Sequence, residues 1–293
     1  MKKFTTDAAG NLTQVQETDP NLGAVYTSYS YDVLNQLRTV SMPRGSTTQT
    51  RTFVYGGYSV SGRAGLAHFL LSATNPENGM VTNTYSGRQV ASKVDAKGQQ
   101  ITYAYDSYKR VTQISKFPDG TNEHACQRVT YNYDSNPDTT NYLYTSYLAG
   151  RLASVHYAGA SCSSGGNNYV DMYAYSQSGQ VTRKTFRLTK GTASGDLEAV
   201  YTYDQEGKML SQSYPLGTTF NYGYDASGRP TKMTDAGTSQ DLVSAVTYGP
   251  AGELLSMTGA SVGETRTYNA NGQLTQLTGI GMNLQVQLCG AGF

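Results

Sequence analysis

The sequence of 293 residues contains no tryptophan, only three histidines and three cysteines, and few charged residues, which make up 15% of it. Lys plus Arg number 22 and Asp plus Glu number 21, so the chain lacks the basic excess that is typical of nucleic-acid binders. Its most apolar stretch, residues 64–71, is far shorter than the roughly 20 residues that a membrane-spanning helix needs. No apolar run follows residues 1–4, so no signal peptide is readable and the localisation stays open.

The recognised motifs of catalysis and cofactor binding are also missing. Cys126, Cys162 and Cys289 are odd in number and widely spaced, which excludes a dense disulfide framework. No glycine-rich phosphate loop, G-x-S-x-G or H-E-x-x-H occurs in the sequence. We therefore expect no cofactor, and the sequence gives little support to an enzyme.

Tyrosine and glycine are what the sequence has in abundance, with 25 Tyr against 7 Phe and with 32 Gly. A tyrosine ring packs well on a pleated sheet while its hydroxyl reaches water or a polar partner. Glycine supplies the backbone freedom that tight turns need. This composition favours an all-β chain with many turns.

Residues 221–230, N-Y-G-Y-D-A-S-G-R-P, predict one β-hairpin. Alternation with a period of two places Tyr222 and Tyr224 on one face of a strand. The Asp225 carboxylate can accept hydrogen bonds from turn amides, and Gly228 can adopt the positive φ that the turn requires.

Degenerate copies of this hairpin recur along the whole chain. They lie near residues 4–15, 29–40, 82–94, 103–114, 131–155, 173–184, 201–212, 222–233, 246–257 and 267–277. A single hairpin cannot bury its apolar face, so stacking on its neighbours must supply the core. We expect a single repeat domain over residues 1–293, with residues 281–293 as a tail outside the repeats. We also expect a loop over residues 41–52 and a short helix within residues 62–72.

The pattern resembles the YD repeats of the Rhs family, whose signature is similar to Y-x-Y-D-x-x-G-R. The residues that carry the resemblance are Tyr31, Asp32, Tyr105, Asp106, Tyr133, Asp134, Tyr203, Asp204, Gly207, Tyr222, Tyr224, Asp225, Gly228 and Arg229. The resemblance implies tandem YD-repeat hairpins that form part of a spiral or curved β-sheet shell or barrel. It also implies an enclosing or adhesive role, because bacterial members encapsulate a toxic C-terminal domain and animal relatives act in cell adhesion. Members of the family are often secreted or found at the cell surface.

Shells of this family look much longer than 293 residues, and the family's core ending, rich in D-P-x-G, is absent. We therefore expect a fragment of a longer toxin-shell protein. A partial spiral exposes unpaired strand edges, so we expect self-association, as a dimer. The implied partners are a toxin domain enclosed by the parent protein and, on a second hypothesis, glycans.

The repeated aspartates and tyrosines allow a structural and a functional interpretation. The Asp residues could form a row of acidic or metal-binding groups, but turn capping explains them better, because Ser176, Gly249 and Asn269 occupy the same position. The tyrosines could form a carbohydrate-binding surface, whereas cross-strand ladders between hairpins are the structural explanation. The arginines after the turns are expected to be exposed or paired with neighbouring repeats.

His124, Cys126 and His156 are the weak candidates for catalysis, and His124 and Cys126 are the weak candidates for a metal site. His124 and Cys126 form an H-x-C pair that is predicted to lie on one face of a strand. Two ligands are too few for a structural zinc site, and no third group is readable that would orient a Cys–His pair. The enzyme hypothesis is therefore a promiscuous hydrolase, metal-assisted or not, that cleaves esters or phosphoesters in a concave face or an inserted loop.

Overall fold

The structure is a computed structural model, and it describes residues 2–20, 23–45, 47–56, 68–158, 167–191, 193–261, 263–279 and 281–285. Regular structure in these residues consists of β-strands and two short 3₁₀ turns, η1 (Ala125–Gln127) and η2 (Tyr142–Tyr144). No helix in this part of the chain is long and apolar enough to cross a membrane. The chain forms two compact units, one of Met1–Tyr131 and His156–Gly166, the other of Asn132–Val155 and Asn167–Phe293.

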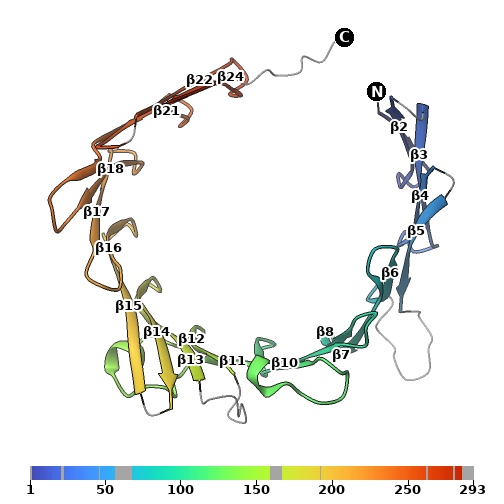
Figure 1. Ribbon diagram of the computed structural model, residues 1–293, viewed down its shortest axis with the longest axis horizontal. Helices are drawn as coiled ribbons and strands as arrows, with labels where there is room; N and C mark the ends of the chain where they lie inside the picture. The colour runs from blue at the N-terminus through green and yellow to red at the C-terminus, as the bar shows by residue number, and fades with distance from the viewer. Residues whose placement is uncertain are drawn as a thin grey trace. The chain divides into compact units, whose positions relative to one another are not determined.

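The first unit is an antiparallel meander in which each strand pairs with the next one in the sequence (Figure 1). Its strands are β1 (Lys3–Thr6), β2 (Leu12–Asp19), β3 (Gly23–Tyr31), β4 (Leu37–Arg44), β5 (Thr47–Tyr55), β6 (Leu70–Asn75), β7 (Gly79–Ser86), β8 (Gln89–Val94), β9 (Gln100–Tyr105) and β10 (Val111–Phe117). The strands β11 (Val129–Tyr133) and β12 (Leu152–Tyr157) contribute residues to both units.

The second unit contains two antiparallel runs of strands. The first run is β13 (Asn167–Tyr175), β14 (Val181–Lys190), β15 (Ala193–Tyr203), β16 (Met209–Ser213), β17 (Thr219–Tyr224), β18 (Pro230–Asp235) and β19 (Asp241–Val243). The second run is a separate five-stranded sheet of β20 (Ala245–Tyr248), β21 (Leu254–Thr258), β22 (Gly263–Tyr268), β23 (Leu274–Gly279) and β24 (Met282–Gln285). The predicted all-β fold of tandem hairpins is confirmed, and among the described strands each run is an open meander rather than a closed barrel.

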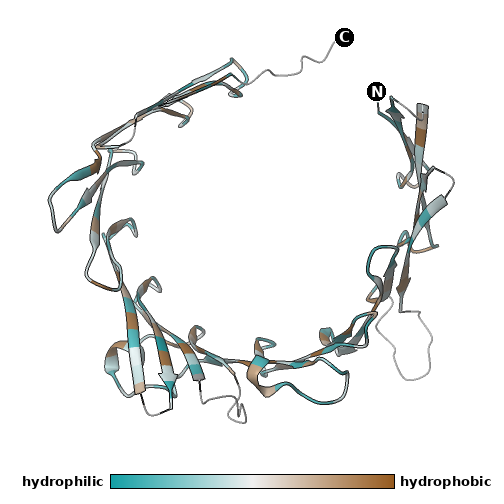
Figure 2. Cartoon of the chain, in the orientation of Figure 1, coloured by the Kyte–Doolittle hydropathy of each residue, from teal (hydrophilic) through white to brown (hydrophobic). Residues whose placement is uncertain are grey.

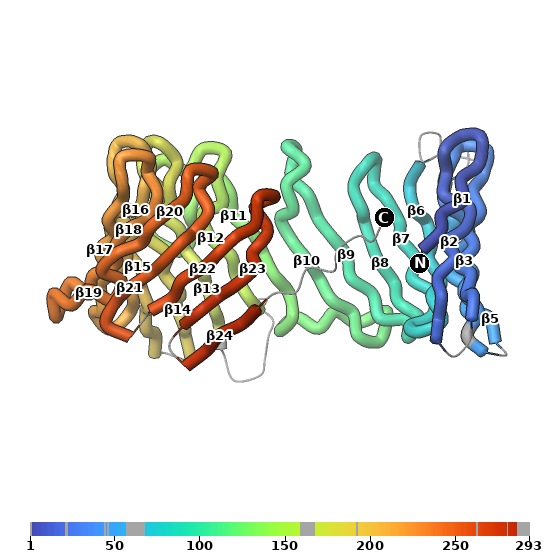
Figure 3. The backbone as a smooth tube through the Cα atoms, turned by 90° about the horizontal axis from the view of Figure 1, so that it is seen from above, coloured from blue at the N-terminus to red at the C-terminus, as the bar shows by residue number. Residues whose placement is uncertain are grey.

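The meander places every second turn of a unit at the same sheet edge, as the tube view in Figure 3 shows. The turns between β1 and β2, β3 and β4, β7 and β8, and β9 and β10 therefore share one edge of the first unit. Three of these turns begin with the repeat aspartates Asp7, Asp32 and Asp106, so the repeat places equivalent side chains along one edge of the sheet.

Few side chains are fully buried, because most of the sheet is a single layer. In Figure 2 polar and apolar residues mix along the strands of both units. Among the described residues of the first unit, Val15 is the buried apolar side chain, and Ser92 and Ser115 are the buried polar ones. The second unit has a compact core, made of Tyr144, Val170, Met172 and Ala174.

Two local expectations are wrong. Residues 41–52 were expected to form a loop, but they belong to the paired strands β4 and β5, whose Ser and Thr side chains face one another across the pair. The short helix expected within residues 62–72 is not formed by its described part, because Leu70–Asn75 is strand β6 and pairs with β5. The rest of that segment lies outside the described residues.

Candidate functional site

The Asp225 turn shows how each hairpin closes. One oxygen of the Asp225 carboxylate accepts hydrogen bonds from the backbone N–H groups of Ser227 and Arg229, each at 2.9 Å. Gly228 has a φ of 78°, the left-handed conformation that the turn needs. The backbone N–H of Arg229 has the largest effect on the pKa of the Asp225 carboxyl and, with the Ser227 amide and the guanidinium, holds it below its usual range. The carboxylate is therefore fully engaged within its own turn.

The same turn recurs in both units. Asp7, Asp32, Asp204 and Asn269 each accept from the amides two and four positions later. The third position after each has a positive φ, and it is occupied by Gly10, Asn35, Gly207 and Gly272. In the Asp106 turn Lys109 takes that place, with a φ of 68°. Asparagine and lysine thus replace glycine there without loss of the turn.

A β-bulge next to the turn orients the second tyrosine of the Y-x-Y-D motif toward the preceding hairpin. The register of β17 and β18 shifts between Gly223 and Tyr224, so that Tyr224 pairs with Pro230. The Tyr224 hydroxyl then donates to the backbone carbonyl of Met209, at 2.7 Å. Met209 begins the strand that leaves the previous turn, so this hydrogen bond joins two successive repeats.

We call this contact the repeat joint, a tyrosine hydroxyl that donates to the carbonyl of the first or second residue of the strand after the preceding turn. Its further members are Tyr31 to Leu12, Tyr85 to Leu70, Tyr105 to Val90, Tyr175 to Leu152, Tyr203 to Val181, Tyr248 to Pro230 and Tyr268 to Leu254, with distances of 2.7–3.0 Å. The ladder interpretation expected contacts between tyrosine side chains, whereas the joint pairs each tyrosine with a main-chain group.

In three turns the basic residue that ends the turn covers the tyrosine of the next joint. Arg229 forms an ion pair with Asp225 at 2.8 Å, and its guanidinium carbon lies 4.6 Å from the centroid of the Tyr248 ring. Lys208 has the same relation to Asp204 and to Tyr224. Arg38 lies over Tyr55, and Arg151 lies over Tyr175. Arg151 and Arg229 thus contact the aromatic face of a neighbouring repeat, whereas Arg110 lies over Tyr108 of its own turn.

In the turn that begins at Gly249, the carboxylate comes from the last residue of the turn instead of the first. Gly249 stands at the aspartate position, and Glu253 stands where the turns of Asp106, Asp204 and Asp225 have Arg or Lys. A Cβ atom on Gly249 would overlap the Glu253 carboxylate, so this carboxylate fills the space that an aspartate side chain would take. The turn keeps its backbone form, because the N–H of Gly252 donates to the Gly249 carbonyl at 3.0 Å.

The turn after β11 is split by an insertion of residues 135–149. Asp134 accepts from the N–H of Gly150 at 2.6 Å, and the N–H of Asp134 donates to the carbonyl of Arg151 at 3.1 Å. Gly150 has a φ of 75°. Asp134 and Gly150–Arg151 thus supply the two halves of one repeat turn, and the insertion separates these halves in the sequence.

Tyr144 fastens this insertion to the face formed by β13, β14 and β15. Its ring packs with Val170 and Met172, and its hydroxyl lies 2.5 Å from the Thr185 hydroxyl. The hydroxyl also donates to Glu198, which forms an ion pair with Arg183 at 2.6 Å. Burial first, and then the hydrogen bond to Glu198, raises the pKa of Tyr144 to about 12, so the hydroxyl stays protonated as a donor.

A second set of polar contacts holds the base of the insertion. The Ser154 hydroxyl donates to Asp138 at 2.5 Å and accepts from the Asn132 amide at 3.0 Å. Arg187 donates to the Asp138 carbonyl at 3.1 Å and pairs with Asp196 at 2.8 Å. These contacts fasten the base of the insertion to the neighbouring strands.

The candidate catalytic and metal-binding residues lie on different elements and do not share one strand face. His124 is exposed and precedes η1, and Cys126 lies within that 3₁₀ turn, so the expected common strand face is wrong. Cys126 is disulfide-bonded, which leaves it no thiolate for nucleophilic attack or metal binding. His156 lies on β12, in a different part of the first unit's sequence. Cys162 and Cys289 lie outside the described residues, and no group of three His, Cys, Asp or Glu that could hold a metal ion occurs among the described ones.

Sequence reasoning missed some residues for which a signal was present. Asp95 and Gly98 form another turn of the repeat type, with Asp95 accepting from the amides of Lys97 and Gln99 at 2.9 Å. The D-x-x-G spacing was readable there, but no tyrosine precedes it. By contrast, Tyr144 and Glu198 are far apart in the sequence, and nothing in their local pattern indicated their contact.

Comparison with known proteins agrees with this construction. The sequence matches the family described as RHS Repeat over residues 7–47 and 203–240. A search of curated proteins found no match. The structure of TcdB2-TccC3 is similar over 95% of this chain, with 17% identity and a TM-score of 0.70. A Photorhabdus luminescens Tc holotoxin pore is similar over the same share, with 16% identity and a TM-score of 0.70.

The chain spans 14% of the length of each of those two chains. At this level of identity the likeness concerns the fold. The family match, by contrast, includes the turns built on Asp32 and Asp225, and the repeat joint connects equivalent tyrosines in both units. Residues 7–47 and 203–240 therefore match RHS repeats, and the same turn and repeat joint recur in described residues between and beyond these two segments.

Proposed function

We propose that the chain is a wall segment of an Rhs-type shell, which encloses another polypeptide as part of a longer protein. The repeat joint is the observation that carries the proposal. It links each hairpin to the one before it through a main-chain acceptor, so the wall can continue without a specific side chain at the acceptor position. The short span of this chain relative to TcdB2-TccC3 supports a longer parent.

The parent protein can be tested directly. Mass spectrometry of the natural gene product should find a polypeptide longer than 31.6 kDa that contains this sequence. In that product, limited proteolysis should leave an internal segment intact as long as the wall is closed. The double variant Tyr224→Phe/Tyr248→Phe weakens two successive joints and should make that segment digestible at lower protease concentration. A natural product of 31.6 kDa, or equal digestion of both forms, would contradict the proposal.

Self-association of the isolated chain is a further part of this proposal. All residues of β1 and β24 are exposed, and among the described strands each pairs with one neighbour only. Such edges present unpaired N–H and C=O groups to a second copy. Light scattering should therefore give a dimer. The variant Phe4→Lys, at a side chain that is 61% exposed, should shift the mass toward the monomer, and a clean monomer of the unaltered chain at high concentration would contradict dimerisation.

The other two hypotheses receive less support from the described residues. A sugar-binding surface of tyrosine ladders would need free hydroxyls and open ring faces, whereas the joint tyrosines donate to carbonyls and several are covered by cations. The hydrolase hypothesis loses Cys126 to its disulfide. Activity of the unaltered chain on a panel of esters that disappeared in His124→Ala would revive it.

A further inference from the structure

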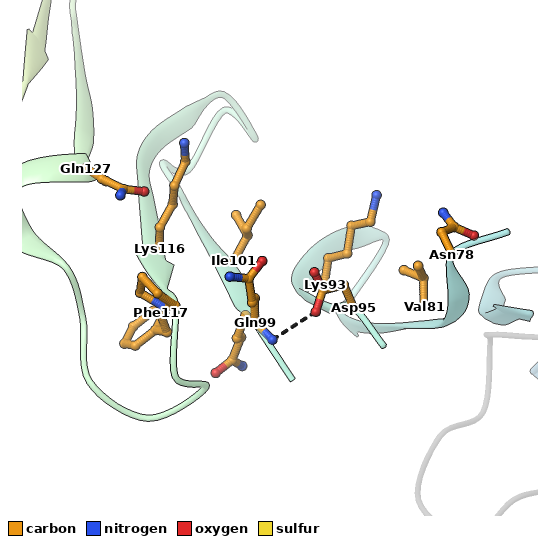
Figure 4. A pocket seen from close by; sticks show the side chains of 11 residues that line it. Asn78, Val81, Lys93, Asp95, Gln99, Ile101, Lys116, Phe117 and Gln127 are labelled. Atoms are coloured by element: carbon orange, nitrogen blue, oxygen red, sulfur yellow. Dashed lines mark hydrogen bonds between the residues drawn. The ribbon is translucent and has the colours of Figure 1, made fainter. Parts of the chain in front are cut away.

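A pocket of about 450 Å³ lies on the face of β7 to β10 in the first unit, next to η1 (Figure 4). Its floor is set by the strand register. Lys93 on β8 is directly opposite Ile101 on β9, and Ile101 is directly opposite Lys116 on β10. Directly opposed residues of neighbouring strands share a face, so the two lysines flank Ile101 at a Cα separation of about 10 Å.

The two ammonium groups extend in the same direction from the sheet, as Figure 4 shows. Both side chains are exposed, and neither forms an ion pair within the described part of the chain. Asp95 also lines the pocket, but its carboxylate accepts from the turn amides of Lys97 and Gln99. The pocket therefore carries one net positive charge, and its cations are available to a ligand.

The remaining walls combine amides with apolar groups. Asn78, Gln99 and Gln127 bring primary amides to the rim, and Phe117 and Val81 form apolar sides. Primary amides donate to and accept from hydroxyl groups, and an aromatic side chain packs against the C–H face of a sugar ring. A ligand that uses all three kinds of group carries a carboxylate, several hydroxyls and an apolar face.

The geometry points to a binding site for an acidic sugar, a uronic acid of one or two rings whose carboxylate pairs with Lys93 or Lys116. The volume lies in the range of small-molecule sites, about 300–1,000 Å³. This site is separate from the joint tyrosines, so it does not depend on a sugar-binding tyrosine ladder, and it goes beyond the role of the wall segment.

Titration calorimetry on the unaltered chain with digalacturonic acid tests the site. Binding is expected, and the neutral disaccharide galactobiose should bind at least tenfold more weakly, because it lacks the carboxylate that meets the ammonium groups. Tricarballylate, which has three carboxylates and no ring or hydroxyl, should also bind at least tenfold more weakly. Equal binding of tricarballylate would overturn the assignment to sugars, and no binding of digalacturonic acid would overturn the site.

Matched variants locate the binding. Lys93→Gln and Lys116→Gln are exposed changes that should keep the fold, and each should weaken digalacturonic acid binding by about tenfold, the loss of one charged hydrogen bond. Lys3→Gln removes the same charge from β1, away from the pocket, and should leave the affinity unchanged. An equal loss in Lys3→Gln would show a general charge effect and overturn the proposal.

Discussion

The guanidinium carbon of Arg229 lies 4.6 Å from the centroid of the Tyr248 ring, and the Tyr248 hydroxyl donates to Pro230, the residue after Arg229, at 2.7 Å. One turn thus holds the next tyrosine at both its face and its hydroxyl. Because the described strands have few buried side chains away from the core around Tyr144, such nearest-neighbour contacts must contribute much of the coupling between hairpins.

The joint hydrogen bond should be measurable in a single variant. Tyr224→Phe removes the hydroxyl that donates to Met209 and leaves that carbonyl without this partner. We expect the free energy of unfolding to fall by about 1 kcal/mol, measured by chemical denaturation. Tyr142→Phe is the matched control, since Tyr142 is 73% exposed, and it should change the stability by less than about 0.5 kcal/mol. Equal values for the two variants would contradict a stabilising role of the joint.

Gly249 and Glu253 should behave as a coupled pair. Gly249→Asp alone places a second carboxylate against Glu253, so we expect a loss of about 1 kcal/mol in the free energy of unfolding. The double variant Gly249→Asp/Glu253→Arg recreates the arrangement of Asp225 and Arg229 and should recover that loss. A double-mutant cycle should then give a favourable coupling of about 1 kcal/mol. Additive effects of the two substitutions would show that Glu253 does not fill the aspartate position.

The turn carboxylates should make the stability depend on acid pH. The pKa of Asp225 lies below its usual value of 3.8, chiefly because the Arg229 amide donates to the carboxylate. As the pH falls, the Asp225 carboxylate therefore becomes protonated in the unfolded chain before it does so in the folded chain. Its contribution to the free energy of unfolding is present above pH 3.8 and is lost as the pH falls through the lower pKa of the folded state. The free energy of unfolding, measured from denaturation curves at a series of acidic pH values, should decrease less steeply with falling pH for Asp225→Asn than for the unaltered chain. Identical slopes would contradict this assignment.

Tyr144 should decide whether the insertion stays on the sheet. Tyr144→Phe keeps the ring in its core position but removes the hydroxyl contacts to Thr185 and Glu198. We expect a loss of about 1–3 kcal/mol in the free energy of unfolding, because Glu198 loses a donor in a partly buried place. Residues 135–149 should also be cleaved faster in limited proteolysis, with Tyr142→Phe again as the control. Unchanged cleavage would show that the apolar contacts alone hold the insertion.

The repeat turn was predictable because it is local. Asp225, Gly228 and Arg229 lie within five consecutive residues, and both the carboxylate–amide bonds and the positive φ follow from residue type and spacing. The same reasoning overlooked Asp95, whose turn has the spacing but no tyrosine. It also did not pair Asp134 with Gly150, because residues 135–149 separate the two halves of that turn. In that split turn the partner Gly150 is supplied from beyond the insertion.

By itself, then, the sequence determined that this chain is a series of β-hairpins that resemble Rhs repeats, because the repeat turns are encoded by side chains that contact their own backbone. The tertiary structure decided how the hairpins are joined and where a site can form. The acceptor of Tyr224, the ring beneath Arg229 and the alignment of Lys93 with Lys116 all depend on strand register and on a bulge at each turn. Register arises from pairing between strands, and interruptions of different length separate the partners, so no fixed spacing in the sequence specifies these contacts.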